Sequence, residues 1–174
     1  RLPEPPSFFD DPRDLLYDLG RSFTISHRHF LIDNIDRLPL KFLRGGLRYN
    51  DEGVEIIDRI EASGQDREGR AEAYRRLRTV LDEDDDAYDA LNSAVDRALA
   101  RVRWNYKTAI PMYYPRKNKM SLLLPICLLR EGQADVALVV ERVRSQNYIG
   151  QTILTMRQAY QDARLVCRPD SDWL

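Results

Sequence analysis

The hydrophobic pattern of this 174-residue chain changes its period near residue 105. Before that point, apolar residues recur at helical spacing, as in REGRAEAYRRLRTVL (67–81) and AYDALNSAVDRALARVRW (87–104). This spacing predicts amphipathic helices, because a helix turns once in about 3.6 residues. After that point the apolar residues form short alternating or continuous runs, which are typical of strands. Helices followed by strands predict an α+β domain.

Strand-like runs follow residue 105, and their order predicts an antiparallel β-meander packed on the N-terminal helices. The runs are TAIPMYYP (108–115), MSLLLPICLL (120–129), VALVVERV (136–143) and YIGQTILT (148–155). One short helix, MRQAYQDA (156–163), is expected as an insertion before a last strand, RLVCRP (164–169). Because the second and third runs are apolar at consecutive positions, we expect helices on one face of the sheet and further cover on the other.

We expect one domain over residues 1–174, since a chain of this length can bury a single core. Residues 1–9 (RLPEPPSFF) are expected to form an extended arm, residues 10–104 to be mainly helical and residues 105–174 to form the sheet. Arg1 is not a natural start, so we expect the chain to be part of a longer protein.

The first part of the helical half is harder to assign. DDPRDLLYDLG (10–20) and HRHFLIDNIDRLP (27–39) have helical spacing, and RSFTIS (21–26) alternates like a short strand. The glycine pair at 45–46 is expected to break the chain. VEIIDRIEAS (54–63) fits either a helix or a strand.

The composition excludes several classes of protein. Hydrophobic residues make up 43% of the chain and charged residues 32%, as in globular rather than disordered proteins. No apolar run approaches the ~20 residues needed to span a bilayer, and no secretory signal is present. We therefore expect a cytoplasmic protein without membrane contact. A net charge of −1 argues against a uniformly basic nucleic-acid-binding surface.

The sequence predicts no cofactor and no metal site. Cys127 and Cys167 fall in apolar stretches without the spacing of zinc ligands, and we interpret them as buried reduced thiols. The acidic run DEDDD (82–86) precedes a predicted helix, where negative charge suits the helix dipole better than a cation site. The acids considered for a metal-dependent nuclease form no recognisable pair. They are Asp33, Asp36, Asp162 and Asp170.

The segment RWNYKTAIPMYYPRKNK (103–119) has two interpretations. Its basic side chains can neutralise phosphates while its tyrosines stack on bases. The residues with these roles would be Arg103, Tyr106, Lys107, Tyr113, Tyr114, Arg116, Lys117 and Lys119. Alternatively, the segment is an ordinary joint between a helix and a β-hairpin. Strand alternation would then place Met112 and Tyr114 on one face and Tyr113 on the other, and RKNK would be a turn.

Several segments resemble a known family, the "domain of unknown function 3825". They are HFLIDNIDRLP, WNYKTAIPMYYP, MSLLLPICL, ADVALVVER, YIGQTILT and AYQDARLVCRPDSDWL. The resemblance runs from about residue 27 to the end, apart from residues 40–85. It implies a role in RNA metabolism, because the family occurs beside cold-shock and LOTUS-type winged-helix modules, but it implies no specific activity. It also implies an upstream portion beyond this chain.

The resemblance carries over to individual positions. The matching residues are His29, Asn34, Arg37, Asn105, Tyr106, Lys107, Tyr160, Arg164, Asp170 and Trp173. The chain departs from the family pattern in two places: Arg157 stands where an acid is usual, and Gln161 with Asp162 replaces a pair of asparagines. Chemistry that depended on that acid would be lost here.

Three functional hypotheses follow. The main one is an RNA- or nucleotide-binding domain whose binding residues are Asn34, Arg37, Arg103, Asn105, Tyr106, Tyr113, Tyr114, Arg116, Tyr160 and Asp170. The second is a hydrolase of phosphodiester or pyrophosphate bonds, so whether the chain is an enzyme stays open. In that hypothesis His29 is the acid/base, because its ordinary pKa near 6.5 suits proton transfer, and Lys107 and Arg164 steady the developing charge. His29 can equally anchor its helix.

The third hypothesis is a non-catalytic interaction domain. In it, the hairpin formed by the first two strand runs docks a partner protein or the upstream portion of the chain. The sequence does not determine the oligomeric state.

Overall fold

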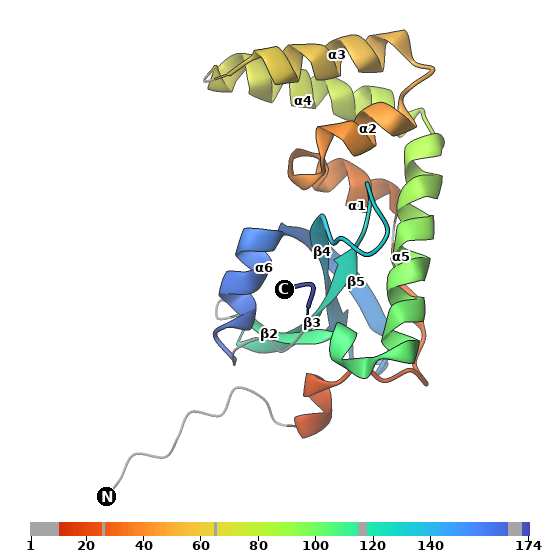
Figure 1. Ribbon diagram of the computed structural model, residues 1–174, viewed down its shortest axis with the longest axis vertical. Coiled ribbons are helices and arrows are strands. Elements are labelled where there is room, and N and C mark those ends of the chain that lie inside the picture. The colour runs from red at the N-terminus through yellow and green to blue at the C-terminus, as the bar shows by residue number, and fades with distance from the viewer. Residues whose placement is uncertain (1–10, 26, 65, 115–117, 167–171) are drawn as a thin grey trace, which may run out of the picture.

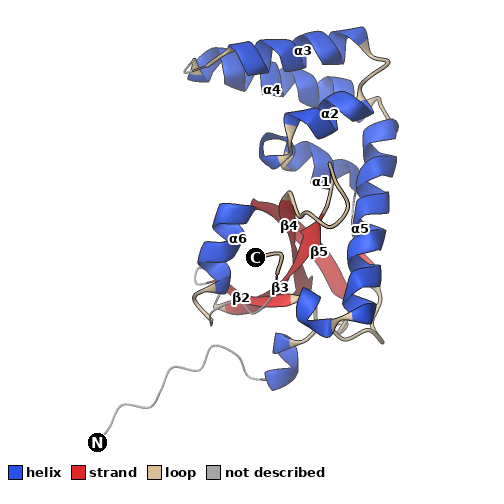
Figure 2. Cartoon of the chain, viewed as in Figure 1, coloured by secondary structure: helices blue, strands red, loops and turns tan. Residues whose placement is uncertain are grey.

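The computed structural model describes residues 11–25, 27–64, 66–114, 118–166 and 172–174, and of residues 27–29 it describes the backbone only. The strands gather at one end of the molecule, and the helices of residues 27–82 lie at the other (Figure 2). The predicted α+β class is confirmed. Among the described helices, none is both long and apolar enough to cross a bilayer.

The helical end consists of α1 (His27–Asp33), α2 (Leu40–Gly46), α3 (Asp51–Ala62) and α4 (Arg67–Asp82). α3 and α4 lie side by side above α2 (Figure 1). Each begins at a side-chain cap, since Asn50 Oδ1 accepts from Gly53 N at 2.9 Å and Asp66 Oδ1 accepts from Gly69 N at 3.0 Å. The segment VEIIDRIEAS, whose sequence fitted either a helix or a strand, is therefore helical and belongs to α3 up to Ala62.

The longest helix, α5 (Asp86–Trp104), joins the two ends of the molecule and runs along the sheet (Figure 1). The predicted stripe of apolar residues is buried along it. Gly46 is part of α2 rather than a chain break, which corrects the sequence expectation. A Cβ at Gly46 would lie 2.7 Å from that of Ala87, so the glycine permits α2 to approach α5 closely.

The sheet has five strands in the order β1-β5-β4-β3-β2. These are β1 (Phe23–Thr24), β2 (Ile110–Tyr114), β3 (Lys119–Ile126), β4 (Val136–Arg142) and β5 (Tyr148–Thr155). Strands β2, β3 and β4 each pair antiparallel with the next strand in the sequence, as expected for a β-meander. β1 pairs parallel with β5, however, so the sheet is mixed and the purely antiparallel prediction is wrong. The short β1 precedes α1 in the chain and lies at the edge of the sheet beside β5. The alternation of its residues does not indicate whether it runs parallel or antiparallel to its neighbour.

Helices cover both faces of the sheet. This agrees with the sequence, in which two strand runs are apolar on both faces. On one face, Leu124, Leu138 and Ile153 belong to a core that continues into α1, α4 and α5. On the other, Leu123 and Val139 pack with Ala159 and Ala163 of α6 (Met156–Ala163). α6 and α5 thus lie on opposite sides of the sheet (Figure 1).

Three local expectations need correction. Residues 10–20 form only a short 3₁₀ turn, η1 (Pro12–Leu15), in their described part. Residues 27–39 divide into α1 and a second 3₁₀ turn, η2 (Ile35–Arg37), because Asn34 turns its side chain into the core. Residues 164–166 form a turn after α6 and not the start of a strand; residues 167–169, with Cys167, lie outside the described part.

Candidate functional site

The structure divides the segment 103–119 into three pieces. Arg103 and Trp104 end α5, and Asn105 caps that end and starts a 3₁₀ turn, η3 (Tyr106–Thr108). The Asn105 Oδ1 atom accepts from Lys107 N at 3.1 Å, which fixes the turn. β2 follows, and residues 115–117, with the predicted Arg116, lie outside the described residues.

The first candidate surface lies at the C-terminal end of α5. Trp104 is 92% exposed there and Tyr106 is 60% exposed. Between the helix end and the chain terminus is a hollow of about 490 Å³. It is lined by Arg101, Trp104, Asn105, Lys107, Thr108, Pro125, Asp172 and Trp173. We call these residues, together with Tyr106, the helix-end surface.

Two contacts hold the helix-end surface in place. The Trp173 indole donates from Nε1 to the Thr108 carbonyl at 3.0 Å, which ties the chain terminus to η3. Arg101 Nη1 lies 3.2 Å from the sulfur of Cys127, a buried thiol as predicted. The predicted Asn105, Tyr106 and Lys107 are thus adjacent on a built surface, together with Trp104, which the sequence hypotheses did not name.

The adjacent tyrosines of β2 do not join this surface. Tyr113 donates from its hydroxyl to Asn118 Oδ1 at 2.6 Å, across the hairpin. Tyr114 lies on the same face as Met112, as strand alternation predicts, and both line a separate hollow on the sheet. The segment therefore does not form one continuous platform.

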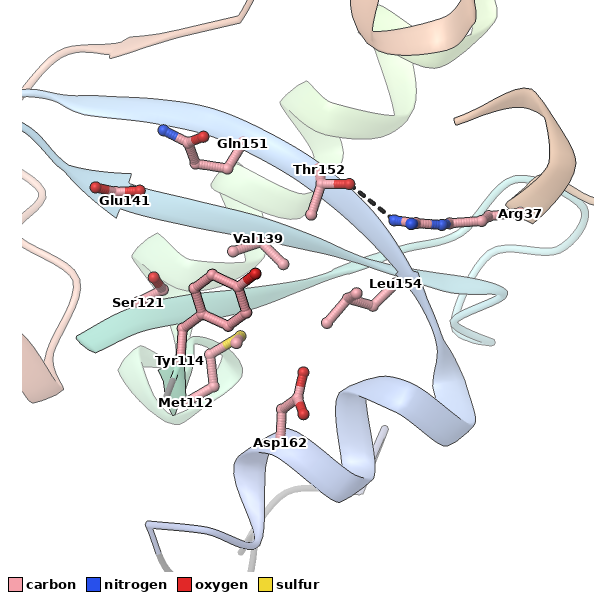
Figure 3. A pocket seen from close by; sticks show the side chains of 10 residues that line it. All are labelled: Arg37, Met112, Tyr114, Ser121, Val139, Glu141, Gln151, Thr152, Leu154 and Asp162. Atoms are coloured by element: carbon pink, nitrogen blue, oxygen red, sulfur yellow. Dashed lines mark hydrogen bonds between the residues drawn. The ribbon is translucent and has the colours of Figure 1, made fainter. Parts of the chain in front are cut away.

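This second hollow, the sheet pocket, has a volume of about 340 Å³. Figure 3 shows its ten lining residues, which are Arg37, Met112, Tyr114, Ser121, Val139, Glu141, Gln151, Thr152, Leu154 and Asp162. Four strands supply the floor, η2 supplies Arg37 at one edge and α6 supplies Asp162 at another (Figure 3). The pocket lies beside the part of the sheet that α6 covers.

Arg37 is held by neutral oxygen atoms. Its Nη1 donates to Thr152 Oγ1 at 2.8 Å, to the Ile153 carbonyl at 2.5 Å and to Asn34 Oδ1 at 3.3 Å. Asn34 is 4% exposed, and its Oδ1 also accepts from Thr152 Oγ1 and Ile153 N. The predicted Asn34 and Arg37 therefore form one network, in which the asparagine positions the arginine.

A β-bulge shapes the floor beside Arg37. Val139 pairs with Thr152 and the next residue, Val140, pairs with Gly150, so Gln151 is an extra residue in β5. Because a bulge disturbs strict alternation, the consecutive residues Gln151 and Thr152 both line the pocket. Gly150, an isolated glycine inside the strand run YIGQTILT, is the sequence signal for such a bulge, because glycine in a strand often marks one.

Two carboxylates line the pocket. Glu141 is 8% exposed and forms an ion pair with Lys119 on the neighbouring strand. The Asp162 carboxylate makes no hydrogen bond or ion pair with any described residue, and burial raises the pKa of this carboxyl above the ordinary value of 3.8. No group of three or more described His, Cys, Asp or Glu side chains is placed to hold a metal ion.

Of the three proposed catalytic side chains the structure describes two, those of Lys107 and Arg164, and these two do not line a common hollow. Lys107 lines the helix-end surface. Arg164 follows α6, where its guanidinium carbon lies 5.6 Å from the ring centre of Tyr160 and lines neither hollow. The side chain of His29 and the whole of Asp170 lie outside the described residues. The hydrolase hypothesis stays a prediction.

Sequence reasoning missed the polar floor of the sheet pocket. Ser121 and Glu141 are polar residues inside otherwise apolar strands, and that interruption was the available signal. Gln151 and Thr152 gave no such signal, since their shared position depends on the bulge.

No curated protein matches the chain, and no solved structure does. The family described as "Domain of unknown function (DUF3825)" matches residues 1–173. This span contains all residues of the sheet pocket and every described residue of the helix-end surface. It is also the family that the sequence segments resemble. The chain therefore belongs to the DUF3825 family.

Proposed function

We propose that this domain binds single-stranded RNA through the helix-end surface. The observation that carries the proposal is the exposure of Trp104, at 92%, beside Tyr106, at 60%. Exposed aromatic rings on a rigid turn are the groups on which unpaired bases stack, and each stacked base contributes about 1–3 kcal/mol. Neither ring is needed for the core, because neither belongs to a buried cluster of the described residues.

The charge around the two rings supports the same ligand. Arg101 and Lys107 line the hollow together with Trp104 and one acidic residue, Asp172, and Arg103 lines a neighbouring hollow. Basic residues also suit the C-terminal end of a helix, so on their own they would be weak support. Beside two exposed rings they offer phosphate contacts, and affinity should then fall as salt rises.

The test is a fluorescence-anisotropy titration of a labelled single-stranded RNA at two salt concentrations. Changing both Trp104→Ala and Tyr106→Ala should weaken binding by about tenfold or more, because two stacking contacts are lost. Tyr49→Ala is the matched control, since Tyr49 is 82% exposed beside Arg48 but lies at the helical end of the molecule.

Two results would contradict the proposal. One is unchanged RNA affinity in the Trp104/Tyr106 double variant. The other is an equal loss in Tyr49→Ala, which would indicate a general effect of exposed aromatic residues. Lys107→Ala should lower the salt dependence as well as the affinity, as loss of a phosphate contact requires.

A further inference from the structure

We propose that the sheet pocket is a second, independent ligand site. It takes a small molecule that carries an oxyanion, either phosphate or carboxylate, at one end and an amino or hydroxyl donor at the other. Arg37 would bind the oxyanion and Asp162 would accept from the donor.

The guanidinium of Arg37 has N–H groups that can donate to an anion. Its three protein acceptors all contact Nη1, so Nε and Nη2 have no acceptor among the described residues. A guanidinium binds an oxyanion best through two parallel N–H groups, and Nε with Nη2 forms such a pair. The network through buried Asn34 holds the group in place, which lowers the entropy cost of binding.

Arg37 also has no counter-charge among the described residues. Arg37 is half-buried, yet no described carboxylate lies within ion-pair distance of it, although Glu141 and Asp162 line the same pocket. Arg44 of α2 shows the contrasting case, since it pairs with Asp58 at 2.5 Å and Glu61 at 3.1 Å. Partial burial of an unpaired charge costs stability, and a bound anion would offset that cost.

Another edge of the pocket carries a complementary group. The side chain of Asp162 projects from α6 toward the floor of the pocket (Figure 3), and its carboxylate has no partner in the described part of the chain. Glu141, by contrast, is already paired with Lys119. Asp162 is thus the carboxylate available to accept from a ligand, and burial, which raises its pKa, makes such a partner favourable.

The floor between the two charged groups fits a small organic molecule. Met112, Val139 and Leu154 supply apolar surface, and the ring of Tyr114 forms one side (Figure 3). Ligand pockets have volumes of about 300–1,000 Å³, and the sheet pocket, at about 340 Å³, lies at the small end of that range. This size suits a single nucleotide or a short dicarboxylate rather than a polymer.

The test is an NMR titration of the purified chain that follows the Arg37 Nε–H signal and the amides of Gln151 and Thr152. The phosphate probes are adenosine 5′-monophosphate and inorganic phosphate, with adenosine as the probe that lacks the anion. The carboxylate probes are glutamate and glutarate, which differ in the amino donor. The two arms distinguish the sources of the oxyanion.

We expect saturable shifts at Arg37 in at least one arm, and none with adenosine. Arg37→Gln should abolish these shifts at Gln151 and Thr152, whereas Arg44→Gln should leave them unchanged. Asp162→Asn, which breaks no described hydrogen bond, should weaken a probe with a donor by about tenfold and leave inorganic phosphate or glutarate unaffected. This variant tests the pocket even if Arg37→Gln does not fold.

The proposal is overturned if no probe gives a saturable shift, if adenosine binds as well as its monophosphate, or if Asp162→Asn weakens all probes equally. It does not depend on RNA binding. The Trp104/Tyr106 double variant should keep the small-molecule shifts, and Asp162→Asn should keep RNA affinity. Each proposal can therefore fail without the other.

Discussion

At the scale of single residues, Asn34 connects the two halves of the chain. Its Nδ2 donates to the Phe30 carbonyl at 2.9 Å, and its Oδ1 accepts from Thr152, from Ile153 N and from Arg37. One buried amide thus joins the end of α1 to β5 and to the edge of the sheet pocket. A polar residue in such a position is stable only because each of its atoms has a partner.

We predict that Asn34→Ala lowers the free energy of unfolding by about 2–3 kcal/mol, since it leaves buried backbone groups of Phe30 and Ile153 without partners. Urea unfolding measures the change. Asn92→Ala is the control, because the Asn92 Oδ1 is buried without a hydrogen-bond partner in the described structure. Equal losses in the two variants would contradict this account.

Asp162 leads to a prediction about pH. Burial raises the pKa of its carboxyl, so the folded protein binds this proton more tightly than the unfolded chain does. Stability therefore falls as pH rises through the interval above the ordinary value of 3.8. Asp162→Asn should raise the melting temperature at pH 7, and this gain should disappear below about pH 4. A gain that is independent of pH would show that desolvation of the charge is not its cause.

At the scale of elements, α6 closes one side of the sheet pocket. The helix has only eight residues, too few to be stable alone. It is held by Ala159 and Ala163, which are buried against the sheet, and by a capping box. In that box Thr155 N donates to Gln158 Oε1 at 3.0 Å, and Gln158 N donates to Thr155 Oγ1 at 3.4 Å.

We predict that Thr155→Ala costs about 1 kcal/mol and that the loss is concentrated in α6. Amide hydrogen exchange should show reduced protection in residues 156–163 and unchanged protection in α3. Thr79→Ala in α4 is the control, because Thr79 is an exposed helical threonine with no capping role. Uniformly faster exchange across the whole chain would contradict a local effect.

At the scale of the whole molecule, one hydrophobic core continues from the helical end into the sheet. It contains Leu77 of α4, Leu91 of α5 and Leu138 of β4, each fully buried. α5 makes this continuity possible, since it packs against the helices along its first half and against the sheet along its second (Figure 1). This arrangement predicts one cooperative unit, in keeping with the single domain expected from chain length.

We therefore predict that the helical end and the sheet unfold together. Circular dichroism follows the helices. The fluorescence of Trp173, which is partly buried against the sheet, follows the sheet end, whereas Trp104, at 92% exposure, contributes little change. The two melting curves should coincide. Leu77→Ala and Leu138→Ala should each cost about 2–5 kcal/mol and lower both curves equally. If Leu77→Ala melts the helices while the fluorescence transition stays in place, the molecule has two independent units.

The sequence predicted those features that depend on neighbours along the chain. Helices α4 and α5 and the four-stranded meander follow from periodicity, because each element must bury one face or one stripe. The Asn105 turn follows from the side chain's ability to bond its own backbone. The alternation of β2 likewise determined that Met112 and Tyr114 share a face.

Only the tertiary structure decided the features that depend on residues far apart in sequence. β1 pairs parallel with β5, Gly46 permits contact with Ala87, and the bulge at Gln151 sets the pocket floor. Apart from Gly150, which can mark a bulge, these features have no local signature, because each is a match between surfaces that meet only after folding. The same reason separates Tyr114 from Tyr106, although both belong to one basic and aromatic segment. The segment's composition was determined by the sequence, but its division between an RNA-binding surface and a small-molecule pocket, as we propose, depends on where the sheet and α5 carry its two ends.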